Sequence, residues 1–520
     1  MAEKTRFGGF FYVCVTHKYR HALRYHGIAL CRAKETITAA CTTLGYTRTM
    51  NTLCWLNASD LYKQYAMGGV QPSAAVAATL ERAVECEPKL NSLYLLKSKQ
   101  AQQSAAESDA RWKAGKALSP LDGVPITLKE NLYTTGDPAP IGTAANSLTP
   151  KTANAPIADR VREAGLVLIG KTTMPDFGML SSGQSSFHGV TRNPWQLNRN
   201  PGGSSSGAGA ACAAGYGPLH IGTDIGGSVR IPASFCGIYG LKPSLGRAPI
   251  NPPYMGRVAG PMTRTVLDAA LLMNVISRPD PDHRDFMNLP PQAVDYAAEL
   301  ERFSLKGKRI GMITDMRAGL EVQSDVAAAT WECGQLLEQH GARVQPIQPF
   351  ITRDMLDGIC GFFEARSYSD ISRMSDAVRE KILPFIVHWA LHRAKGFSGD
   401  TVMGFFAQVM AMREATVAAT HGYDFVISPV CPIPAFKAEH CSPDNDPERA
   451  LAHIAFTVPY NMSEQPAASI NWTYSTDARS AGLPIGVQVA GRRFDDLGVL
   501  QISRVIEQIR PKQRPWPIRI

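Results

Sequence analysis

Two clusters of glycine and serine within residues 201–243 are the first place where this sequence could perform chemistry. The first reads Gly-Gly-Ser-Ser-Ser-Gly over 202–207, and the second reads Gly-Gly-Ser over 226–228. Glycine costs conformational entropy, so a chain keeps it where the backbone needs a positive φ or a very close approach. Backbone N–H groups after Asp224 could therefore converge on one point and bind a phosphate or a developing oxyanion. Ser228 would stand at the edge of that point as a nucleophile.

Nucleotide-binding loops are the competing interpretation of such glycine-rich segments. The phosphate-loop pattern GxxxxGK followed by Ser or Thr is absent from the chain. Residues 207–212 contain only a fragment of the dinucleotide pattern GxGxxG, because its third glycine is missing. The sequence therefore favours a serine nucleophile over nucleotide binding.

A serine nucleophile needs a base, and the sequence offers two kinds. His188 and His220 are the nearby histidines, but neither lies in a recognisable motif, and a structural role suits each better. Lys129 directly follows the apolar run of residues 124–128, which is typical of a buried strand. A lysine at a buried strand end could act as the base, because burial lowers the pKa of an amine.

Three segments in order carry a resemblance to a known family. They read GVPITLKEN from residue 123, PGGSSSGAG from residue 201 and GTDIGGSVRIPASFCGIYGLKP from residue 222. Together they resemble the amidase signature family of Ser–cis-Ser–Lys hydrolases, and the similarity extends over roughly residues 58–510. The resemblance implies an α/β fold, namely a single large domain whose mixed, twisted central β-sheet is covered by helices on both faces.

The resemblance also implies a mechanism. The protein is expected to be an amidohydrolase that cleaves a carboxamide C–N bond through a serine-linked acyl-enzyme, with ester or carbamate side activity and without a metal or cofactor. A lysine base would need its pKa to fall from about 10.4 to roughly 7–8. The residues implied are the nucleophile Ser228, the bridging Ser204 in a cis peptide, the base Lys129, the oxyanion-hole amides of Ile225, Gly226, Gly227 and Ser228, and the supporting side chains Ser205, Thr223, Asp224 and Arg230.

Alternative functions remain open at this point. The glutamine-hydrolysing component of the tRNA-dependent amidotransferase belongs to the same family and usually shows GGSSGGS. This chain has Ser206 at the third glycine of that pattern and Ala208 at its last serine, which favours a stand-alone amidase. A non-catalytic binding protein is disfavoured because Lys129, Ser204 and Ser228 are all present. The substrate, whether an amide, an anilide or a carbamate, is not encoded in a recognisable motif, and a homodimer is possible.

Composition limits the remaining classes. The 520 residues are 44 % apolar, which is ample for a large core, and no run is long enough to span a membrane. Residues 1–49 carry +6 of the net charge of +9, so the remaining chain is nearly neutral and does not suggest nucleic-acid binding. Eleven cysteines without CxxC pairs indicate reduced thiols in a cytoplasmic protein. We expect residues 1–49 to be a basic, poorly structured extension and 50–520 to be the catalytic domain.

Elements that would position these residues can be predicted from periodicity and capping signals. Serines at 59, 73 and 98 are plausible N-caps. Residues 350–415 are apolar and irregular, and we interpret them as the core of peripheral helices rather than as the wall of a substrate pocket. Helices are predicted at 60–67, 74–87, 99–116, 156–164, 324–340 and 495–509, and strands at 166–169, 308–314, 342–346, 423–430 and 482–491.

Overall fold

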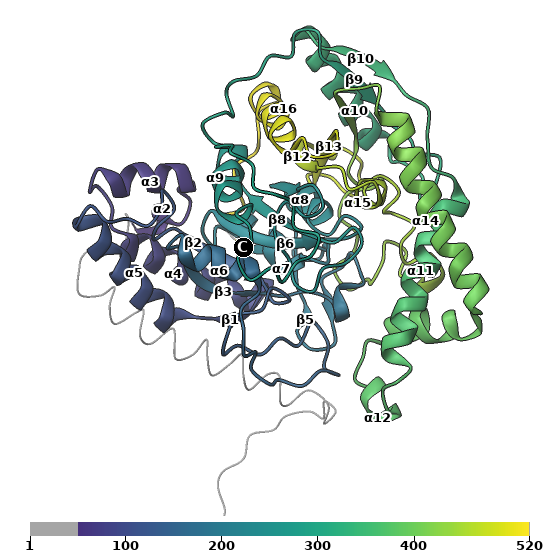
Figure 1. Ribbon diagram of the computed structural model, residues 1–520, viewed down its shortest axis with the longest axis horizontal. Helices are drawn as coiled ribbons and strands as arrows, with labels where there is room; N and C mark the ends of the chain where they lie inside the picture. The colour runs from purple at the N-terminus through teal and green to yellow at the C-terminus, as the bar shows by residue number, and fades with distance from the viewer. Residues whose placement is uncertain (1–49, 519) are drawn as a thin grey trace, which may run out of the picture.

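An eleven-stranded mixed β-sheet organises the protein in the computed structural model, which describes residues 50–518 and 520 (Figure 1). Its strand order is β1-β3-β2-β6-β8-β7-β12-β13-β11-β9-β10. Strands β3, β2 and β6 run parallel, as do β11, β9 and β10, whereas all the other neighbours are antiparallel. The strands are β1 (Leu93–Leu96), β2 (Pro125–Lys129), β3 (Val167–Thr172), β6 (Leu219–Asp224), β7 (Tyr239–Lys242), β8 (Val258–Thr263), β9 (Arg309–Met312), β10 (Arg343–Pro346), β11 (Phe425–Pro429), β12 (Ala467–Tyr474) and β13 (Pro484–Gly491); β4 (Gln184–Ser185) and β5 (Gly189–Val190) form a separate hairpin.

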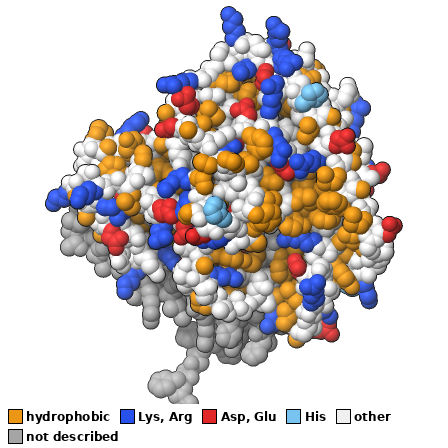
Figure 2. Space-filling model, in the orientation of Figure 1, with side chains coloured by type: hydrophobic (Ala, Val, Ile, Leu, Met, Phe, Trp, Pro, Cys, Tyr) orange, Lys and Arg blue, Asp and Glu red, His pale blue; other side chains and the backbone are white. Residues whose placement is uncertain are grey.

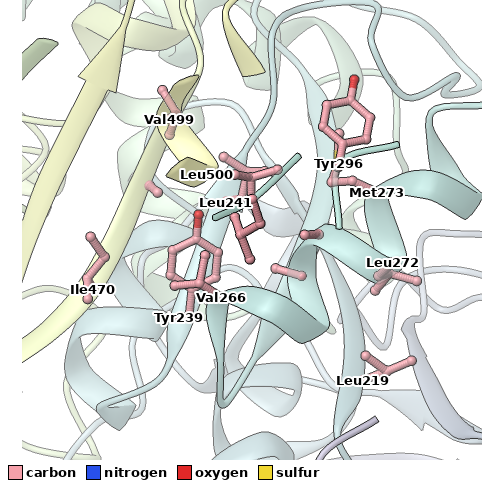
Figure 3. Packing of buried hydrophobic residues seen from close by; sticks show 14 of the residues in the cluster. Leu219, Tyr239, Leu241, Val266, Leu272, Met273, Tyr296, Ile470, Val499 and Leu500 are labelled. Carbon is pink, nitrogen blue, oxygen red and sulfur yellow. The ribbon is translucent and has the colours of Figure 1, made fainter. Parts of the chain in front are cut away.

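Helices cover both faces of this sheet, which confirms the predicted architecture. On one face α9, α10 and α16 pack against side chains that alternate along the strands, such as Tyr239 and Leu241 of β7 (Figure 3). On the other face α7 and α8 lie against the strands that surround the glycine-rich segments. The longer helices are α3 (Ala58–Ala66), α4 (Pro72–Leu90), α5 (Ser98–Lys113), α6 (Pro156–Glu163), α7 (Ser206–Ala214), α8 (Arg230–Cys236), α9 (Val266–Ile276), α10 (Ser324–Gln339), α11 (Arg353–Ile371), α14 (Gly399–Thr420) and α16 (Asp496–Ile509); the short ones are α2 (Met50–Leu53), α12 (Asp376–Arg379), α13 (Pro384–Val387), α15 (Val458–Met462), η1 (Asp176–Gly178), η2 (His388–His392), η3 (Ala394–Gly396) and η4 (Pro447–Arg449).

Helix α7 shows why the first glycine-rich segment has its composition. All nine of its residues are buried, and none is larger than cysteine. A Cβ atom at Gly207 would lie 2.2 Å from the backbone oxygen of Ser92 and 2.5 Å from the amide nitrogen of Thr173. Only glycine lets the helix approach the neighbouring backbone this closely. The small residues therefore fix the position of the serines that precede the helix.

The N-terminal helices begin close to the predicted positions, but the predicted serine caps are wrong. Ser59 and Ser73 lie inside the first turns of α3 and α4, whose N-cap residues are Asn57 and Gln71. The Asp268 carboxylate accepts hydrogen bonds from the amides of Ala58 and Ser59, both at 3.0 Å, and Asp109 Oδ1 accepts one from Ser73 N at 3.0 Å. Carboxylates that are distant in sequence thus satisfy the helix ends, and local sequence does not reveal them. Ser98 is likewise the first residue of α5 rather than its cap.

The predicted β–α–β unit is confirmed, because β9, α10 and β10 follow one another and the two strands pair in parallel. Residues 350–415 form a layer of helices at one side of the molecule, in which α11 packs along α14 (Figure 1). The rings of Phe362 and Phe406 lie 5.8 Å apart between these two helices. The interpretation as peripheral helical core therefore holds for most of this segment.

Apolar side chains also gather on the surface over the side where α14 lies (Figure 2). Met403, Met410 and Val417 of this helix are among the exposed large hydrophobic residues. Within residues 50–518, no helix has the length and apolar character that crossing a membrane would require. The predicted N-terminal extension, residues 1–49, lies outside the described residues.

Candidate active site

The glycine-rich segments meet at the carboxyl ends of two neighbouring parallel strands. Strand β2 ends at Lys129 and strand β6 ends at Asp224, and the two strands pair through Leu128 and Ile221. Carboxyl ends of adjacent parallel strands are a common place for a site in α/β folds. The segment that leads into α7 supplies Ser204 and Ser205 to the same point, and the turn between β6 and α8 supplies Ser228.

Lys129 is completely buried, and its amine contacts three hydroxyl groups. Nζ lies 2.8 Å from Ser204 Oγ, 3.1 Å from Ser205 Oγ and 3.0 Å from Thr223 Oγ1. Burial lowers the pKa of Lys129 well below its ordinary value, and the positive charge of Arg257 lowers it further. The structure thus holds this lysine where a neutral amine is favoured.

Hydrogen-bond bookkeeping identifies which hydroxyl can donate to that amine. A neutral lysine amine offers two N–H donors and one lone pair, so one of its three partners must donate to it. The Ser205 hydroxyl already donates to Thr223 O at 3.1 Å. Ser204 Oγ has no other hydrogen-bond partner in the described part of the chain. The Ser204 hydroxyl is therefore well placed to donate its proton to Lys129.

Ser204 and Ser228 line the same cavity, which has a volume of about 270 Å³. The peptide bond between Gly203 and Ser204 is cis, as the resemblance implied. The amide of Ser205 donates to the backbone oxygen of Ser228 at 3.2 Å, which ties the two segments together. Among the hydrogen bonds of residues 50–518, none joins the hydroxyls of Ser204 and Ser228 directly.

The turn after β6 differs in one respect from the predicted oxyanion hole. Gly227 has a φ of 126°, and its amide donates to Asp224 Oδ1 at 2.8 Å. This amide is already engaged, so its prediction as an oxyanion donor needs correction. The amides of Ile225, Gly226 and Ser228 make no hydrogen bond within the described residues, and all three residues line the cavity. Three backbone donors are thus available to a negatively charged oxygen.

A buried ion pair holds the turn in place. Arg230 binds both carboxylate oxygens of Asp224, at 3.1 and 3.0 Å, and neither side chain is exposed. Burial alone would raise the pKa of Asp224, but the charge and hydrogen bonds of Arg230 hold it below its ordinary value. Oδ2 of the same aspartate also accepts a hydrogen bond from Val229 N at 3.0 Å. The predicted supporting pair therefore organises the backbone amides around Ser228.

Further residues of this network were not selected in the sequence analysis. Arg230 Nη1 donates to the backbone oxygen of Thr457 at 2.9 Å and to Gln488 Oε1 at 2.8 Å, and Nη2 donates to Asn461 Oδ1 at 2.5 Å. Thr457 Oγ1 donates to Gly226 O at 2.6 Å. These three residues are more than 220 positions beyond Arg230, so nothing in local spacing connects them with it.

The two histidines lie outside the cavity. His220 Nδ1 is 2.7 Å from Thr127 Oγ1 between strands β6 and β2, and burial lowers its pKa to about 3. His188 Nε2 is 3.0 Å from Glu130 Oε2, with both side chains buried. Neither histidine is among the residues that line the cavity.

The cavity walls combine apolar and charged side chains. Helix α11 presents Phe363, Arg366, Ser367 and Asp370 to it, at a spacing that places them on one helix face. Part of the 350–415 segment is therefore pocket wall, in addition to its peripheral packing. In residues 50–518 and 520, no group of His, Cys, Asp and Glu is arranged to hold a metal ion. The apolar wall includes Ile141, Phe177, Leu180, Trp389, Leu451 and Ile454.

Comparisons with known proteins agree with this geometry. A family model described as Amidase matches residues 74–500. An acylamidase of Rhodococcus erythropolis is 30 % identical over 483 residues, covering 89 % of this chain and 97 % of the relative. The glutamyl-tRNA(Gln) amidotransferase protein of Myxococcus xanthus that carries the letter A among the components of that enzyme is 32 % identical, covering 86 % and 96 %.

Solved structures give the same result. A bacterial aryl acylamidase of the amidase signature family superposes with a TM-score of 0.79 at 25 % identity, covering 87 % of this chain and 96 % of that one. A 6-aminohexanoate cyclic dimer hydrolase superposes with a TM-score of 0.76 at 26 % identity, covering 90 % and 99 %. The similarity extends over nearly the full length of both neighbours.

Proposed function

This chain belongs to the amidase signature family, hydrolases that act on C–N bonds, and from this premise we propose that it is a stand-alone amidohydrolase of small carboxamides. Its nucleophile is Ser228, its bridging residue is Ser204 and its base is Lys129. Anilides and carbamates fall within the same reaction class, because acyl transfer to a serine requires only a polarised carbonyl and a leaving group.

The observation that carries this proposal is the buried contact between Lys129 and Ser204 beside a cavity that Ser228 also lines. A serine hydroxyl is a weak nucleophile unless a neighbour accepts its proton. A charged lysine cannot accept one, whereas a lysine whose pKa is lowered by burial can. The three free amides beside Ser228 supply the second requirement, donors for the developing oxyanion.

The proposed reaction proceeds in two halves. Ser228 Oγ attacks the amide carbon while its proton passes to Ser204, whose own proton passes to Lys129. The negative charge on the carbonyl oxygen is met by the amides of Ile225, Gly226 and Ser228. The C–N bond then breaks, and the leaving amine takes a proton back along the same route. Water next attacks the acyl-enzyme ester with the same base and releases the carboxylic acid.

A second candidate is the glutamine-hydrolysing component of a tRNA-dependent amidotransferase, because several relatives at 30–33 % identity carry the name of that enzyme. The departures at Ser206 and Ala208 favour the stand-alone enzyme. The cavity favours it too, since its apolar wall suits an acyl or aryl group better than the polar side chain of glutamine. Glutaminase activity that appears only with a partner protein would decide for the second candidate.

The test uses a serine-reactive fluorophosphonate and a panel of amides. We expect the full-length protein to be labelled and to release amine from acetanilide and 4-nitroanilide substrates, with acid and amine identified by mass spectrometry. Ser228→Ala should lose both labelling and turnover while retaining its circular dichroism spectrum. A Ser206→Ala variant is the matched control, because that serine is the first residue of α7 and does not line the cavity. Labelling of the Ser228→Ala variant at the wild-type rate would refute the assignment.

A further inference from the structure

Two arginine side chains line the cavity beside the proposed nucleophile without a carboxylate partner. Arg257 lies immediately before β8, and Arg366 lies on the cavity face of α11. Nη1 of Arg257 donates to the backbone oxygen of Pro252 at 2.8 Å, and the guanidinium of Arg366 lies 3.9 Å from the ring centre of Tyr254. In the described part of the chain, neither guanidinium is within ion-pair distance of an aspartate or glutamate.

The remaining charged groups of the cavity do not balance these two. Asp224 is neutralised by its own buried partner, Arg230. Asp370 lies one turn after Arg366 on α11 and is exposed, so its charge is screened by solvent. Burial, together with the neighbouring charge of Arg366, lowers the pKa of Arg257 to about 10. The cavity thus holds two like charges near one another, which is unfavourable unless an anion joins them.

We propose that the enzyme acts on amides that carry a carboxylate away from the scissile bond, and that Arg257 and Arg366 bind this carboxylate. The inference rests on the proposed amidase function and names its substrate class. The planar fork of a guanidinium matches the two oxygens of a carboxylate, which makes arginine the preferred residue for such recognition. The arginines come from two different segments that meet at one cavity, so one anion can contact both.

The size and walls of the cavity limit the rest of the substrate. A volume of about 270 Å³ accommodates a small molecule rather than a long chain. Phe177, Trp389 and Ile454 offer apolar contacts to the carbon skeleton between the amide and the carboxylate. Small amides of dicarboxylic acids and small N-acylated amino acids fit these conditions, and they differ in whether the carboxylate lies on the acyl or on the amine side.

The experiment compares substrates of equal size that differ in one charge. On the acyl side these are glutaric acid mono-4-nitroanilide and pentanoic acid 4-nitroanilide. On the amine side they are 4-acetamidobenzoate and acetanilide. We expect kcat/KM of the wild type to favour the carboxylate in at least one pair by about 10- to 100-fold, the range of a charge-assisted hydrogen bond.

Variants locate the source of that preference. Arg257→Gln and Arg366→Gln should each reduce the ratio of kcat/KM between the charged and the neutral substrate by about tenfold or more. Arg366→Lys should retain part of it. Arg373→Gln is the matched control, because Arg373 lies just after the same helix, bonds only to Ser369 and does not line the cavity. The ratio should be unchanged in that variant.

Two outcomes separate this inference from the proposed function. If neutral amides are hydrolysed as well as charged ones, or if both glutamine variants keep the preference, the carboxylate inference is overturned and the amidase function stands. If no amide is hydrolysed and Ser228 is not labelled, the amidase function fails. Calorimetric binding of the glutaric and pentanoic anilides to Ser228→Ala then still tests recognition, and equal affinity for the two would overturn it.

Discussion

Lys129 Nζ lies 2.8 Å from Ser204 Oγ, and the lysine side chain has no exposed surface. Its position follows from the sequence, because an apolar strand carries it into the core and the small residues of α7 let the serine segment approach. Since the Ser205 hydroxyl is committed to Thr223 O, the Ser204 hydroxyl is the group that can donate to a neutral amine. Burial thereby sets both the charge of the lysine and the direction of proton transfer.

The first prediction concerns pH. Because burial lowers the pKa of Lys129, the amine is neutral over a range in which a free lysine is charged. Protonation at acidic pH removes the base, so kcat/KM should fall about tenfold per pH unit below the lowered pKa and level off above it. Asp224, whose pKa lies below its ordinary value, stays ionised and does not contribute to this fall. A pH–rate profile that is flat down to about pH 5 would contradict the assignment of the base.

Replacing the base tests the same relationship by mutation. Lys129→Arg retains hydrogen-bond donors but cannot lose its proton at any accessible pH. We expect kcat/KM to fall by about 10²- to 10⁴-fold, the usual contribution of a general base. Lys63→Arg, at an exposed position on α3, is the matched control and should leave the rate unchanged. Retention of more than a tenth of the activity in Lys129→Arg would show that another group accepts the proton.

Two adjacent glycines should respond differently to alanine. A Cβ on Gly227 would lie 2.5 Å from Thr457 Oγ1 and 2.8 Å from Ile231 Cδ1, at a φ of 126° that other residues rarely adopt. A Cβ on Gly226 would meet its nearest atom, Ile454 Cδ1, at an ordinary 3.5 Å. Gly227→Ala should therefore lower the free energy of unfolding in urea by about 1–3 kcal/mol, whereas Gly226→Ala should change it by less than about 1 kcal/mol. Equal losses in the two variants would contradict this picture of the turn.

The sequence predicted the centre of the site well and its surroundings poorly. Lys129, Ser204 and Ser228 lie in short motifs, where local composition reflects a backbone requirement such as the close approach at Gly207. The engaged amide of Gly227 could not be predicted, because it depends on which way the Asp224 carboxylate turns.

Contacts made by distant segments were also beyond local sequence patterns. Asp268 caps a helix more than 200 residues earlier, and Asn461 reaches Arg230 from the far end of the chain. Arg366 belongs to a segment interpreted as peripheral core, and only the packing of α11 brings it to the cavity. Such residues become visible when the fold brings segments together, since no periodicity marks them.

Breaking the buried ion pair should cost more than removing it. Arg230→Met leaves the Asp224 carboxylate buried without its cation, and such unpaired charges typically lower stability by about 3–5 kcal/mol. In the double variant Asp224→Asn with Arg230→Met, no buried charge remains from the pair. We expect it to recover part of the lost unfolding free energy measured in urea, although not the activity, because the amides around Ser228 lose their anchor. Additive losses from the two single variants would contradict this coupling.

A second buried lysine predicts how stability depends on pH. Lys242 is fully buried, its Nζ donates to Pro243 O at 2.9 Å, and burial, aided by the nearby charge of Arg230, lowers its pKa to about 7. In the unfolded chain the same amine titrates near 10.5. Between these two values the unfolded state binds a proton that the folded state does not, so this group makes the protein more stable as pH rises.

The expected slope is about 1.4 kcal/mol per pH unit between about pH 7 and about 10, and it vanishes below about pH 7 because both states are then protonated. Lys242→Met removes the titrating group but keeps most of the side-chain volume. The difference in urea unfolding free energy between wild type and this variant should therefore shrink or reverse in favour of the wild type as pH rises. Lys63→Met, at the exposed position on α3, provides the control for general effects of alkali. If wild type and Lys242→Met show parallel stability curves across this range, the amine is not buried in its neutral form.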